Sequence, residues 1–389
     1  MRGIVKILWF LFVISFFCSC VNKERTKHRP DFSSVRKIDI SADISKDEIQ
    51  GVIELDSYVP LSNEALIGEI KRVIIYNDLL YILDNEPKIV CFNMKGEVIF
   101  MIDCKGGGPT EFQNLKDFAI DGDSKRIIAF DNEKRRLFFY DMKTGKHISS
   151  ISTFYMSPTE IAYIDSGFFF KNMDTRFDVQ QNHQFYLLYS SNGEQIDTMF
   201  LPHNAVADFN FDLKSFFYND GNLLFVRPFD NIVYALQEAG IIPIYEINLP
   251  NPLPMKKIKE KMRHTDIPKS SYSYGIGDVY VAGKTLHFTF AKDGFVVSTF
   301  FDLSTNTLLY NGIRVLGNAR ESLPFYSIIN GVYEDKFFAL VSASSIVERR
   351  TAHPEFFHGE LSRIKEEDNA VLAYFSVNST RFVQKTTQK

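Results

Sequence analysis

The chain has 389 residues, with 44 Lys and Arg against 48 Asp and Glu, and a formal net charge of −4. Proteins that bind nucleic acids normally carry a basic patch, so this balance disfavours that class. The 37 Phe and 18 Tyr favour β-strands instead, because aromatic side chains pack well on a pleated surface.

The first residues have the pattern of an export signal that ends at a lipid-modified cysteine. A basic start precedes an apolar run of about 10 residues, Leu8 to Phe17, which is too short to span a bilayer. Ser19 then precedes Cys20, an arrangement that resembles a bacterial lipobox. We therefore expect residues 1–19 to be a lipoprotein signal peptide and Cys20 to carry the lipid anchor.

The segments that flank the central part of the chain are polar and show no periodic pattern. We expect residues 20–48 to be the lipidated cysteine and a tether, and residues 379–389 to be a C-terminal tail. A single domain then occupies residues 49–378. Loss of residues 1–19 leaves 42 basic and 48 acidic residues, a net charge of −6.

Within this domain, short apolar strands recur with turn residues between them. Residues 81–99 align with residues 128–148, and the triplet Asp-Asn-Glu recurs after 47 residues. Glycines expected in turns follow at intervals of 49, 48 and 47 residues: Gly96, Gly145, Gly193 and Gly240. A period in the forties with about four strands per unit is typical of a β-propeller. We predict an all-β, six-bladed β-propeller with four-stranded antiparallel blades.

The two ends of the domain are expected to pair and close the ring. The sixth blade ends on the strand within residues 370–378, and residues 51–61 can supply its missing outer strand. Insertions at residues 251–271 and 353–370 are expected to hold short helices. The predicted blades are about 67–102, 115–152, 158–201, 209–249, 272–315 and 323–377.

Two cysteines remain in the domain, Cys91 and Cys104. A turn at Lys95 and Gly96 would place Cys91 opposite about Phe100, which argues against a disulfide with Cys104. There is no CxxC motif and no cysteine spacing typical of a metal site.

The stretch DCKGGGPTEFQNL, Asp103 to Leu115, raises the question of a phosphate-binding loop. Such a loop needs a Lys-Ser/Thr pair and a following helix, whereas a strand is expected here. We interpret the stretch as the connector between the first two blades, and we expect Gly107→Val to damage folding. Glu111 either caps local N–H groups or faces the central channel.

Other polar motifs have structural explanations. The Asp-Asn pairs at Asp84, Asp131 and Asp230 suit turns, and their repetition across blades favours a structural role over a cation site. His353 and His358 lack metal-ligand spacing, and no HExxH or GxSxG motif occurs. We predict no catalytic residue, no metal and no cofactor. Candidate ligand-binding residues are Glu111, Arg135, Arg136, Tyr272 and Tyr274.

A resemblance to a known family supports the fold. The segment GGGPTEFQNLKDFAIDGDSKRIIAFDNEKRRLFFYDMKTGKHI is similar to an NHL-type blade, with a glycine-rich lead, an Asp-Asn turn and a strand that starts with a basic residue. Over about residues 35–378 the chain resembles six-bladed β-propeller lipoproteins of gut-type Gram-negative anaerobes. The resemblance implies a propeller in the cell envelope, anchored by lipid.

These observations favour a non-enzymatic, monomeric propeller that binds an envelope protein or a glycan. The alternative is a propeller enzyme, a lyase or hydrolase that acts on a polysaccharide or lactone at the channel mouth. Converging His, Asp and Glu in the channel would favour the enzyme, and an aromatic and apolar lining would favour binding. Periplasmic and surface-exposed locations both remain open.

Overall fold

The computed structural model describes most of the predicted domain and part of the predicted tether. The signal peptide, Cys20, the tail at 379–389 and most of the insertion at 251–271 lie outside the described residues. The described residues are 35–41, 43–45, 53–153, 158–173, 185–202, 214–219, 222–227, 229–238, 240–254, 256, 271–313, 329–352, 354 and 357–377.

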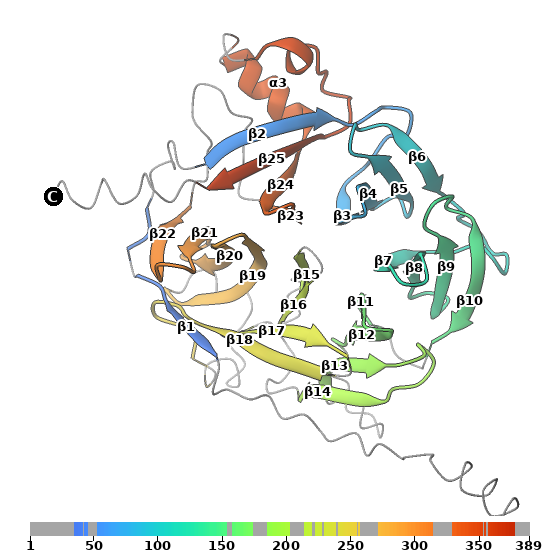
Figure 1. The fold of residues 1–389 in the computed structure, drawn as a ribbon, viewed down its shortest axis with the longest axis horizontal. Coiled ribbons are helices and arrows are strands. Elements are labelled where there is room, and N and C mark those ends of the chain that lie inside the picture. The colour runs from blue at the N-terminus through green and yellow to red at the C-terminus, as the bar shows by residue number, and fades with distance from the viewer. Residues whose placement is uncertain are drawn as a thin grey trace, which may run out of the picture. The chain divides into compact units, whose positions relative to one another are not determined.

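Four antiparallel sheets of four strands each surround a common axis (Figure 1). Apolar residues dominate their inner and middle strands, so that each sheet packs its faces against its neighbours. Their strands are β3 (Ile70–Tyr76), β4 (Leu79–Asp84), β5 (Ile89–Asn93) and β6 (Val98–Ile102); β7 (Leu115–Asp121), β8 (Arg126–Asp131), β9 (Arg136–Asp141) and β10 (His147–Ser152); β11 (Glu160–Ile164), β12 (Gly167–Lys171), β13 (Phe185–Ser190) and β14 (Thr198–Pro202); β19 (Ser273–Ala282), β20 (Thr285–Lys292), β21 (Phe295–Asp302) and β22 (Thr307–Gly312).

A nine-stranded sheet completes the arrangement, where two further blades were predicted. Its two antiparallel parts meet near the axis, where β15 and β23 are joined by a single parallel pair, Asn219 with Val332. The described residues thus form four separate four-stranded blades, and six separate blades are not confirmed. In spatial order the strands are β1 (Arg36–Asp39), β18 (Gly240–Asn248), β17 (Ile232–Gln237), β16 (Asn222–Val226), β15 (Phe216–Asn219), β23 (Gly331–Tyr333), β24 (Lys336–Val341), β25 (Val371–Val377) and β2 (Ile53–Pro60).

The strands nearest the axis contact one another in turn: β3 with β7, β7 with β11, β11 with β15, β15 with β19, β19 with β23, and β23 with β3. Each leads through a turn into the second strand of its sheet. Several of these turns have two successive residues with positive φ, which matches the twist of a hairpin. The turn residues with this geometry include Asn77, Asp78, Asp165, Ser166, Glu334 and Asp335.

The predicted pairing of the two domain ends is confirmed. β2 pairs antiparallel with β25, from Ile53 opposite Val377 to Pro60 opposite Val371. Ile53 is almost fully buried, so this pairing contributes core contacts as well as backbone hydrogen bonds. The N-terminal strand therefore covers an edge that would otherwise be open.

The predicted tether contains a strand of the fold. β1 pairs in parallel with β18, and its Ile38 is fully buried in the core. Further on, Ser45 bridges to Gly312 at the outer edge of the sheet β19–β22. The boundary predicted after residue 48 is therefore wrong, because Arg36–Asp39 and Ser45 are bound to outer strands of the domain.

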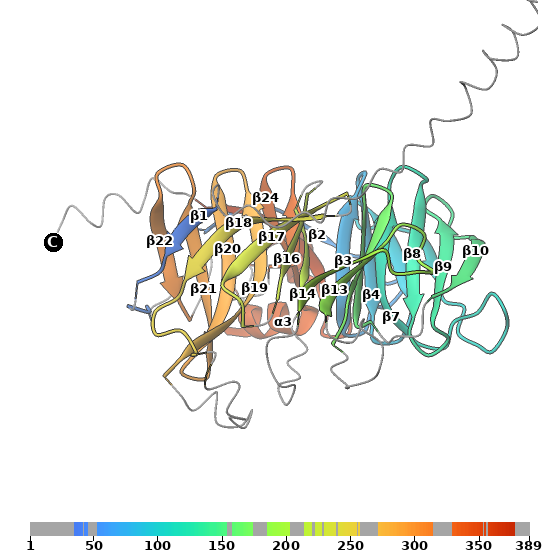
Figure 2. The ribbon, with the colours of Figure 1, turned by 90° about the horizontal axis from the view of Figure 1, so that it is seen from below.

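A helix in the C-terminal part of the domain occupies the ten residues directly before the predicted insertion at 353–370. α3 (Ala343–Ala352) follows β24 directly at one end of its strand, and η4 (Gly359–Ser362) follows within the predicted range 353–370 (Figures 1 and 2). Ala343 and Ile346 are buried, so these two residues fix the helix against the sheet. Among the described residues, no helix has the length and apolar character needed to cross a membrane.

The register around the cysteines agrees with the turn prediction. Cys91 pairs with Phe100, as predicted from the turn at Lys95 and Gly96. Cys91 is buried and Cys104 is exposed, and both are free thiols.

The core contains a neutral histidine. His287 is fully buried beside the rings of Phe300 and Phe337, with centroid separations of 4.7 and 6.2 Å. Its Nδ1 lies 3.0 Å from the carbonyl oxygen of Thr299, which can only accept, so Nδ1 carries the proton. Nε2 has no hydrogen-bond partner. Burial, only partly offset by the Thr299 carbonyl, lowers the pKa of His287 to about 3.

This histidine predicts a pH-dependent stability. Between the ordinary pKa of 6.5 and the native value of about 3, the unfolded chain binds a proton that native His287 excludes. Stability therefore falls as the pH falls through this window, at about 1.4 kcal/mol per pH unit. We expect the stability of wild type relative to His287→Phe to drop by about 2 kcal/mol between pH 6 and pH 4.5. Urea unfolding of both proteins at each pH measures this difference, and parallel pH profiles would contradict it.

Candidate functional site

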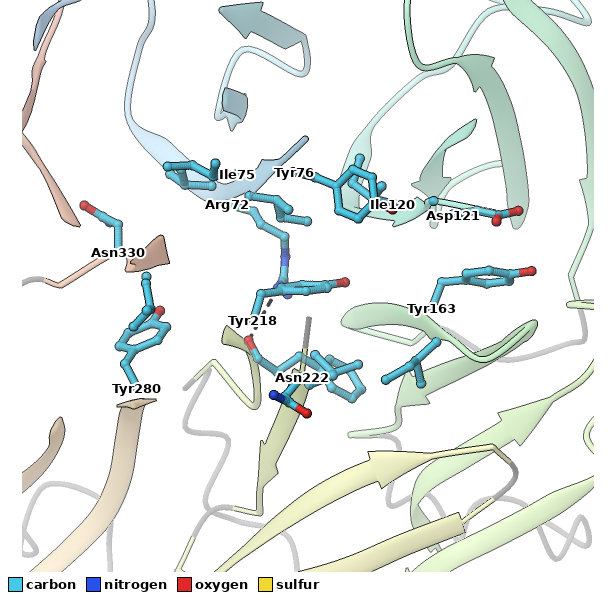
Figure 3. A pocket seen from close by; sticks show the side chains of 18 of the residues that line it. Arg72, Ile75, Tyr76, Ile120, Asp121, Tyr163, Tyr218, Asn222, Tyr280 and Asn330 are labelled. Carbon is cyan, nitrogen blue, oxygen red and sulfur yellow. Dashed lines mark hydrogen bonds between the residues drawn. The ribbon is translucent and has the colours of Figure 1, made fainter. Parts of the chain in front are cut away.

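The main candidate site is a pocket on the axis, which we call the central pocket. It has a volume of about 310 Å³ and is lined by side chains from β3, β7, β11, β15, β19 and β23 (Figure 3). Residues at the ends of these strands and in the turns that follow them form its mouth, since Asp123, Asp165 and Asn222 all belong to the lining. The pocket thus depends on the inner strands ending on the same face.

Tyrosine and amide side chains make up much of the wall. Tyr76, Tyr163 and Tyr218 are half-buried, and Tyr280 is nearly buried. The ring of Phe217 supports Tyr280 edge-to-face at a centroid separation of 5.6 Å. Figure 3 shows these four rings around the cavity, together with the amides of Asn222 and Asn330. Such a wall offers flat apolar surfaces with polar edges.

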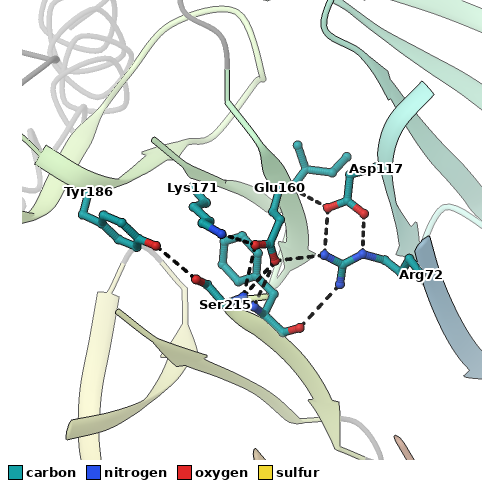
Figure 4. Close-up of polar contacts among 8 residues, drawn as sticks. Arg72, Asp117, Glu160, Lys171, Tyr186 and Ser215 are labelled. Atoms are coloured by element: carbon teal, nitrogen blue, oxygen red, sulfur yellow. Dashed lines mark hydrogen bonds and ion pairs between the residues drawn. The ribbon is translucent and has the colours of Figure 1, made fainter. Parts of the chain in front are cut away.

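Beneath the tyrosines lies a buried network of charges. Arg72 from β3 binds both carboxylate oxygens of Asp117 on β7, and its Nη2 lies 3.2 Å from Oε2 of Glu160 on β11 (Figure 4). Lys171 on β12 pairs with the other oxygen of Glu160. Two cations therefore balance two carboxylates, as buried charges require.

Backbone donors complete this network. The N–H groups of Ser215 and Phe216 lie 3.0 to 3.3 Å from Glu160 carboxylate oxygens, and the N–H of Ile161 donates to Asp117 at 2.7 Å. Although burial by itself would raise it, the pKa of Glu160 is lowered by Lys171 and Arg72. The pKa of Arg72 is raised, because Asp117 and Glu160 outweigh its burial. The pKa of Asp117, in contrast, is raised to about 6, because its burial and the charge of Glu160 outweigh the effect of Arg72. Glu160 and Arg72 are thus held in their charged forms.

One cation of the pocket has no such partner. Lys214 lines the pocket and immediately precedes Ser215, so it lies beside the network. Its ammonium makes no hydrogen bond or ion pair to any described residue. Burial and the charge of Arg72 lower its pKa, although Asp278, Glu160 and Asp117 act in the opposite direction. Lys214 is solvent-exposed, so it is a cation of the pocket that is open to a ligand.

Carboxylates near the mouth are largely engaged. Asp121 accepts hydrogen bonds from Arg126 and from the N–H of Ser124, which keep its pKa low despite its burial. Asp165 accepts from the N–H of Glu238 at 3.0 Å. No histidine lines the pocket, and the described residues contain no group of three or more His, Cys, Asp or Glu placed to hold a metal ion.

Three of the predicted site residues lie around the glycine-rich connector, away from the central pocket. The Glu111 carboxylate accepts from the N–H of Gly108 at 2.7 Å, so it caps the loop and does not face the pocket. Arg136 donates to the carbonyl oxygen of Pro109 at 3.3 Å. Arg135 is exposed in the preceding turn with a φ of 49°. Glu111 and Arg136 thus both support the loop.

Two other predicted residues lie on β19 or beside it. Tyr274 is 9% exposed and lines a second cavity of about 340 Å³, where its ring lies 6.2 Å from that of Phe229. Tyr272 is half-buried and lines neither cavity. The predicted arginines and tyrosines are thus not parts of one site.

The Asp-Asn turns have the structural role that was predicted. Asp131 accepts hydrogen bonds from four backbone N–H groups, those of Gln113, Asn114, Glu133 and Lys134. Gly107, in contrast, does not need to be glycine. A Cβ at that position would meet nothing within 4 Å, so our expectation that Gly107→Val damages folding is wrong.

Sequence reasoning missed the network and Lys214. One signal was present: Arg72, Asp117 and Glu160 each lie in the inner strand of successive repeats, four residues before its end. Arg72 lies 45 residues before Asp117 and 88 before Glu160, which matches the repeat period. A charged residue inside an apolar strand at the same repeat position points toward the axis of the ring.

Fold and site together define a class: an all-β propeller of four-stranded antiparallel blades with a polar pocket on its axis. The chain belongs to the family described as Domain of unknown function (DUF4934), whose model matches residues 35–376. No curated protein matches it.

Two solved structures from Bacteroides are similar to this chain. A Bacteroides fragilis protein named as a candidate exported protein is 18% identical, with a TM-score of 0.70; the match covers 88% of this chain and 99% of that one. A Bacteroides vulgatus member of the DUF4221 family is 12% identical with a TM-score of 0.49, over 85% of this chain and 99% of that one. At these identities the similarity to the first structure supports the fold alone.

Proposed function

We propose that this protein is a non-enzymatic binding module of the cell envelope and that its ligand enters the central pocket. The observation that carries the proposal is the lining, in which four tyrosines and two asparagines surround a cavity whose buried carboxylates are already paired. A rigid ring that presents aromatic and amide groups binds a ligand without needing to move.

We further propose that the nine-stranded sheet is two blades, which makes six in all, as in NHL-like propellers. The support is the single residue pair, Asn219 with Val332, that joins its two parts. Each part has four antiparallel strands of its own, and β1 is added in parallel at the edge of one. Both inner strands also take their place in the ring of contacts around the axis.

The proposed location is the cell envelope, with Cys20 as the lipid anchor. Because Arg36 is already bound to β18, the tether shrinks to residues 21–35. A chain of that length reaches about 50 Å at most. The candidate exported protein from Bacteroides fragilis, which has the same fold, is in keeping with this location. We propose that the domain acts as a monomer near the membrane surface.

An enzymatic function has weaker support. A propeller lyase or hydrolase needs an acid and a base free to exchange protons, and Asp121 and Asp165 accept hydrogen bonds from their own loops and neighbours. Lys214 is the one lining residue whose depressed pKa suits a base, and it lies next to the charge network. Turnover of a polysaccharide or lactone that is lost in Lys214→Met would establish the enzyme instead.

The binding function predicts which tyrosine matters. On an array of envelope glycans and short peptides, we expect the purified protein to bind through the central pocket. Tyr218→Ala should weaken that binding at least tenfold, because the ring is part of the wall. Tyr272→Ala is the matched control, since Tyr272 lies outside both cavities, and should bind as wild type. Equal losses in the two variants, or no binding by wild type, would contradict the proposal.

A further inference from the structure

We propose that the central pocket takes the carboxyl-terminal end of a basic peptide segment, with the terminal carboxylate at Lys214 and a cationic side chain at the mouth. The inference rests on the proposed binding function and names its ligand class. It follows from a separation of charge along the pocket, between Lys214 just before β15 and the acidic turns that follow the inner strands.

Lys214 offers an exposed cation at the end of the pocket that lies away from the turns after the inner strands. Lys214 lies beside the network and has no ion-pair partner among the described residues. Arg72 cannot supply the same attraction, because Asp117 and Glu160 already occupy its guanidinium. Asp278 on β19 is the carboxylate that interacts with Lys214 electrostatically, yet the two form no ion pair within 4.0 Å. A ligand carboxylate would fill this gap.

Asp278 is occupied elsewhere. Its Oδ2 accepts a hydrogen bond from the hydroxyl of Thr289 at 3.1 Å. Burial raises the pKa of Asp278 and so disfavours its charged form, with Lys214 opposing this effect only in part. Because Asp278 forms no ion pair with it, Lys214 remains open to the carboxylate of a ligand.

The mouth of the pocket has the opposite sign. We call the exposed acidic residues in the turns after the inner strands the acidic rim. Two basic residues of the same turns, Lys125 and Lys284, are outnumbered, so the described part of this face is net negative. The Asp123 side chain lines the pocket and forms no ion pair. The acidic rim consists of Asp78, Asp123, Asp165, Glu334 and Asp335.

The wall between the two ends suits a peptide. Tyrosine rings contact aliphatic side chains and attract cations on their faces. The amide of Asn222 is exposed at the mouth, and Asn330 uses its Oδ1 to bind the N–H of Leu340, which leaves its NH₂ group for a ligand. Donors and acceptors of this kind match the N–H and C=O groups of a chain end.

The charges of the pocket favour a basic peptide over a glycan as its ligand. A neutral sugar would complement neither charge, and an acidic sugar would complement Lys214 but not the acidic rim. A basic peptide with a free carboxyl end complements both charges. The cavity of about 310 Å³ accommodates the end of a chain rather than a long segment.

The test uses a library of N-acetylated tripeptides with all residues varied, made once with a free carboxyl end and once as amides. The purified protein is mixed with each library, and bound peptides are identified by mass spectrometry after affinity selection. We expect enrichment of free carboxylates over amides by at least tenfold, and enrichment of Lys and Arg over Asp and Glu.

Variants assign each preference to its residue. Lys214→Met should remove the preference for the free carboxylate, while Lys284→Met, a change of the same kind at the mouth, should keep it. The double variant Asp123→Asn and Asp165→Asn should remove the preference for basic residues. Circular dichroism and urea unfolding confirm that each variant is folded before it is compared.

Equal binding of acids and amides, or a preference for acidic peptides, would overturn the inference. If glycans bind and Tyr218→Ala abolishes that binding, the binding function stands and the ligand class is wrong. If neither peptides nor glycans bind, both the inference and the proposed function fail.

Discussion

Replacing Glu160 by glutamine will lower the free energy of unfolding by about 3 kcal/mol. The carboxylate balances Lys171 and Arg72 and accepts from two backbone N–H groups. Glutamine has nearly the same shape but no charge, so it leaves a buried cation without its counterion. Equilibrium unfolding in urea measures the change, which should appear as a lower midpoint with an unchanged slope.

The same substitution at the surface is the control. Glu246 lies 3.7 Å from Lys37, and the side chain of Lys37 is 71% exposed. Glu246→Gln should cost less than about 1 kcal/mol, because solvent screens an exposed pair. Should the two variants lose the same stability, the buried network would hold the inner strands no more strongly than a surface pair does.

Gly96→Ala will destabilise the protein by about 2–4 kcal/mol, from two separate costs. The residue has a φ of +80°, which strains any residue with a Cβ. That Cβ would also lie 2.2 Å from the carbonyl oxygen of Pro60 in β2, a backbone atom that cannot turn aside. The strand that closes the ring would have to move.

Gly107→Ala is the matched control in the glycine-rich connector. Its φ is not positive, and a Cβ there has no neighbour within 4 Å. We expect a change below about 0.5 kcal/mol, as for most surface substitutions. Thermal and urea unfolding of both variants test the pair. A larger loss at Gly107 than at Gly96 would show that the connector, rather than the repeated turn, controls folding.

Both predictions concern contacts that hold the strands in place, near the axis for Glu160 and at the outer edge for Gly96. Glu160 links inner strands around the axis, and Gly96 lets the outer turn of one sheet approach β2. Gly145 and Gly193 repeat this geometry with positive φ and close contact to Phe100 and Leu137. The pocket depends on the Glu160 network and on the close outer turns, because together they position the strands that form its wall.

Local patterns predicted much of the fold. The turn glycines and the Asp-Asn turns follow from short-range rules of strands and turns, and the pairing of residues 51–61 with the last strand follows from the strand missing in the last repeat. The cross-strand pairing of Cys91 with Phe100 followed from the turn at Lys95 and Gly96. Such features depend on residues close in sequence, or on a repeat that makes distant residues equivalent.

Other features depended on contacts between distant segments. β1 lies within the predicted tether because Ile38 finds a buried position beside β18, some 200 residues away in the chain, and nothing local marks it as a strand. The join of β15 to β23 likewise rests on one residue pair. The positions of the candidate site residues were decided in the same way, since Glu111 and Arg136 bind the glycine-rich connector, away from the central pocket.

The sequence by itself determined the repeat, the type of strand and the closure of the ring, because these follow from periodicity and turn chemistry. Only the tertiary structure decided where function can lie. Arg72, Asp117, Glu160 and Lys214 come from separate repeats and meet at the axis. The mutual neutralisation of the first three with Lys171, and the lack of an ion-pair partner for Lys214 among the described residues, are properties of distances between strands, which no single stretch of sequence records.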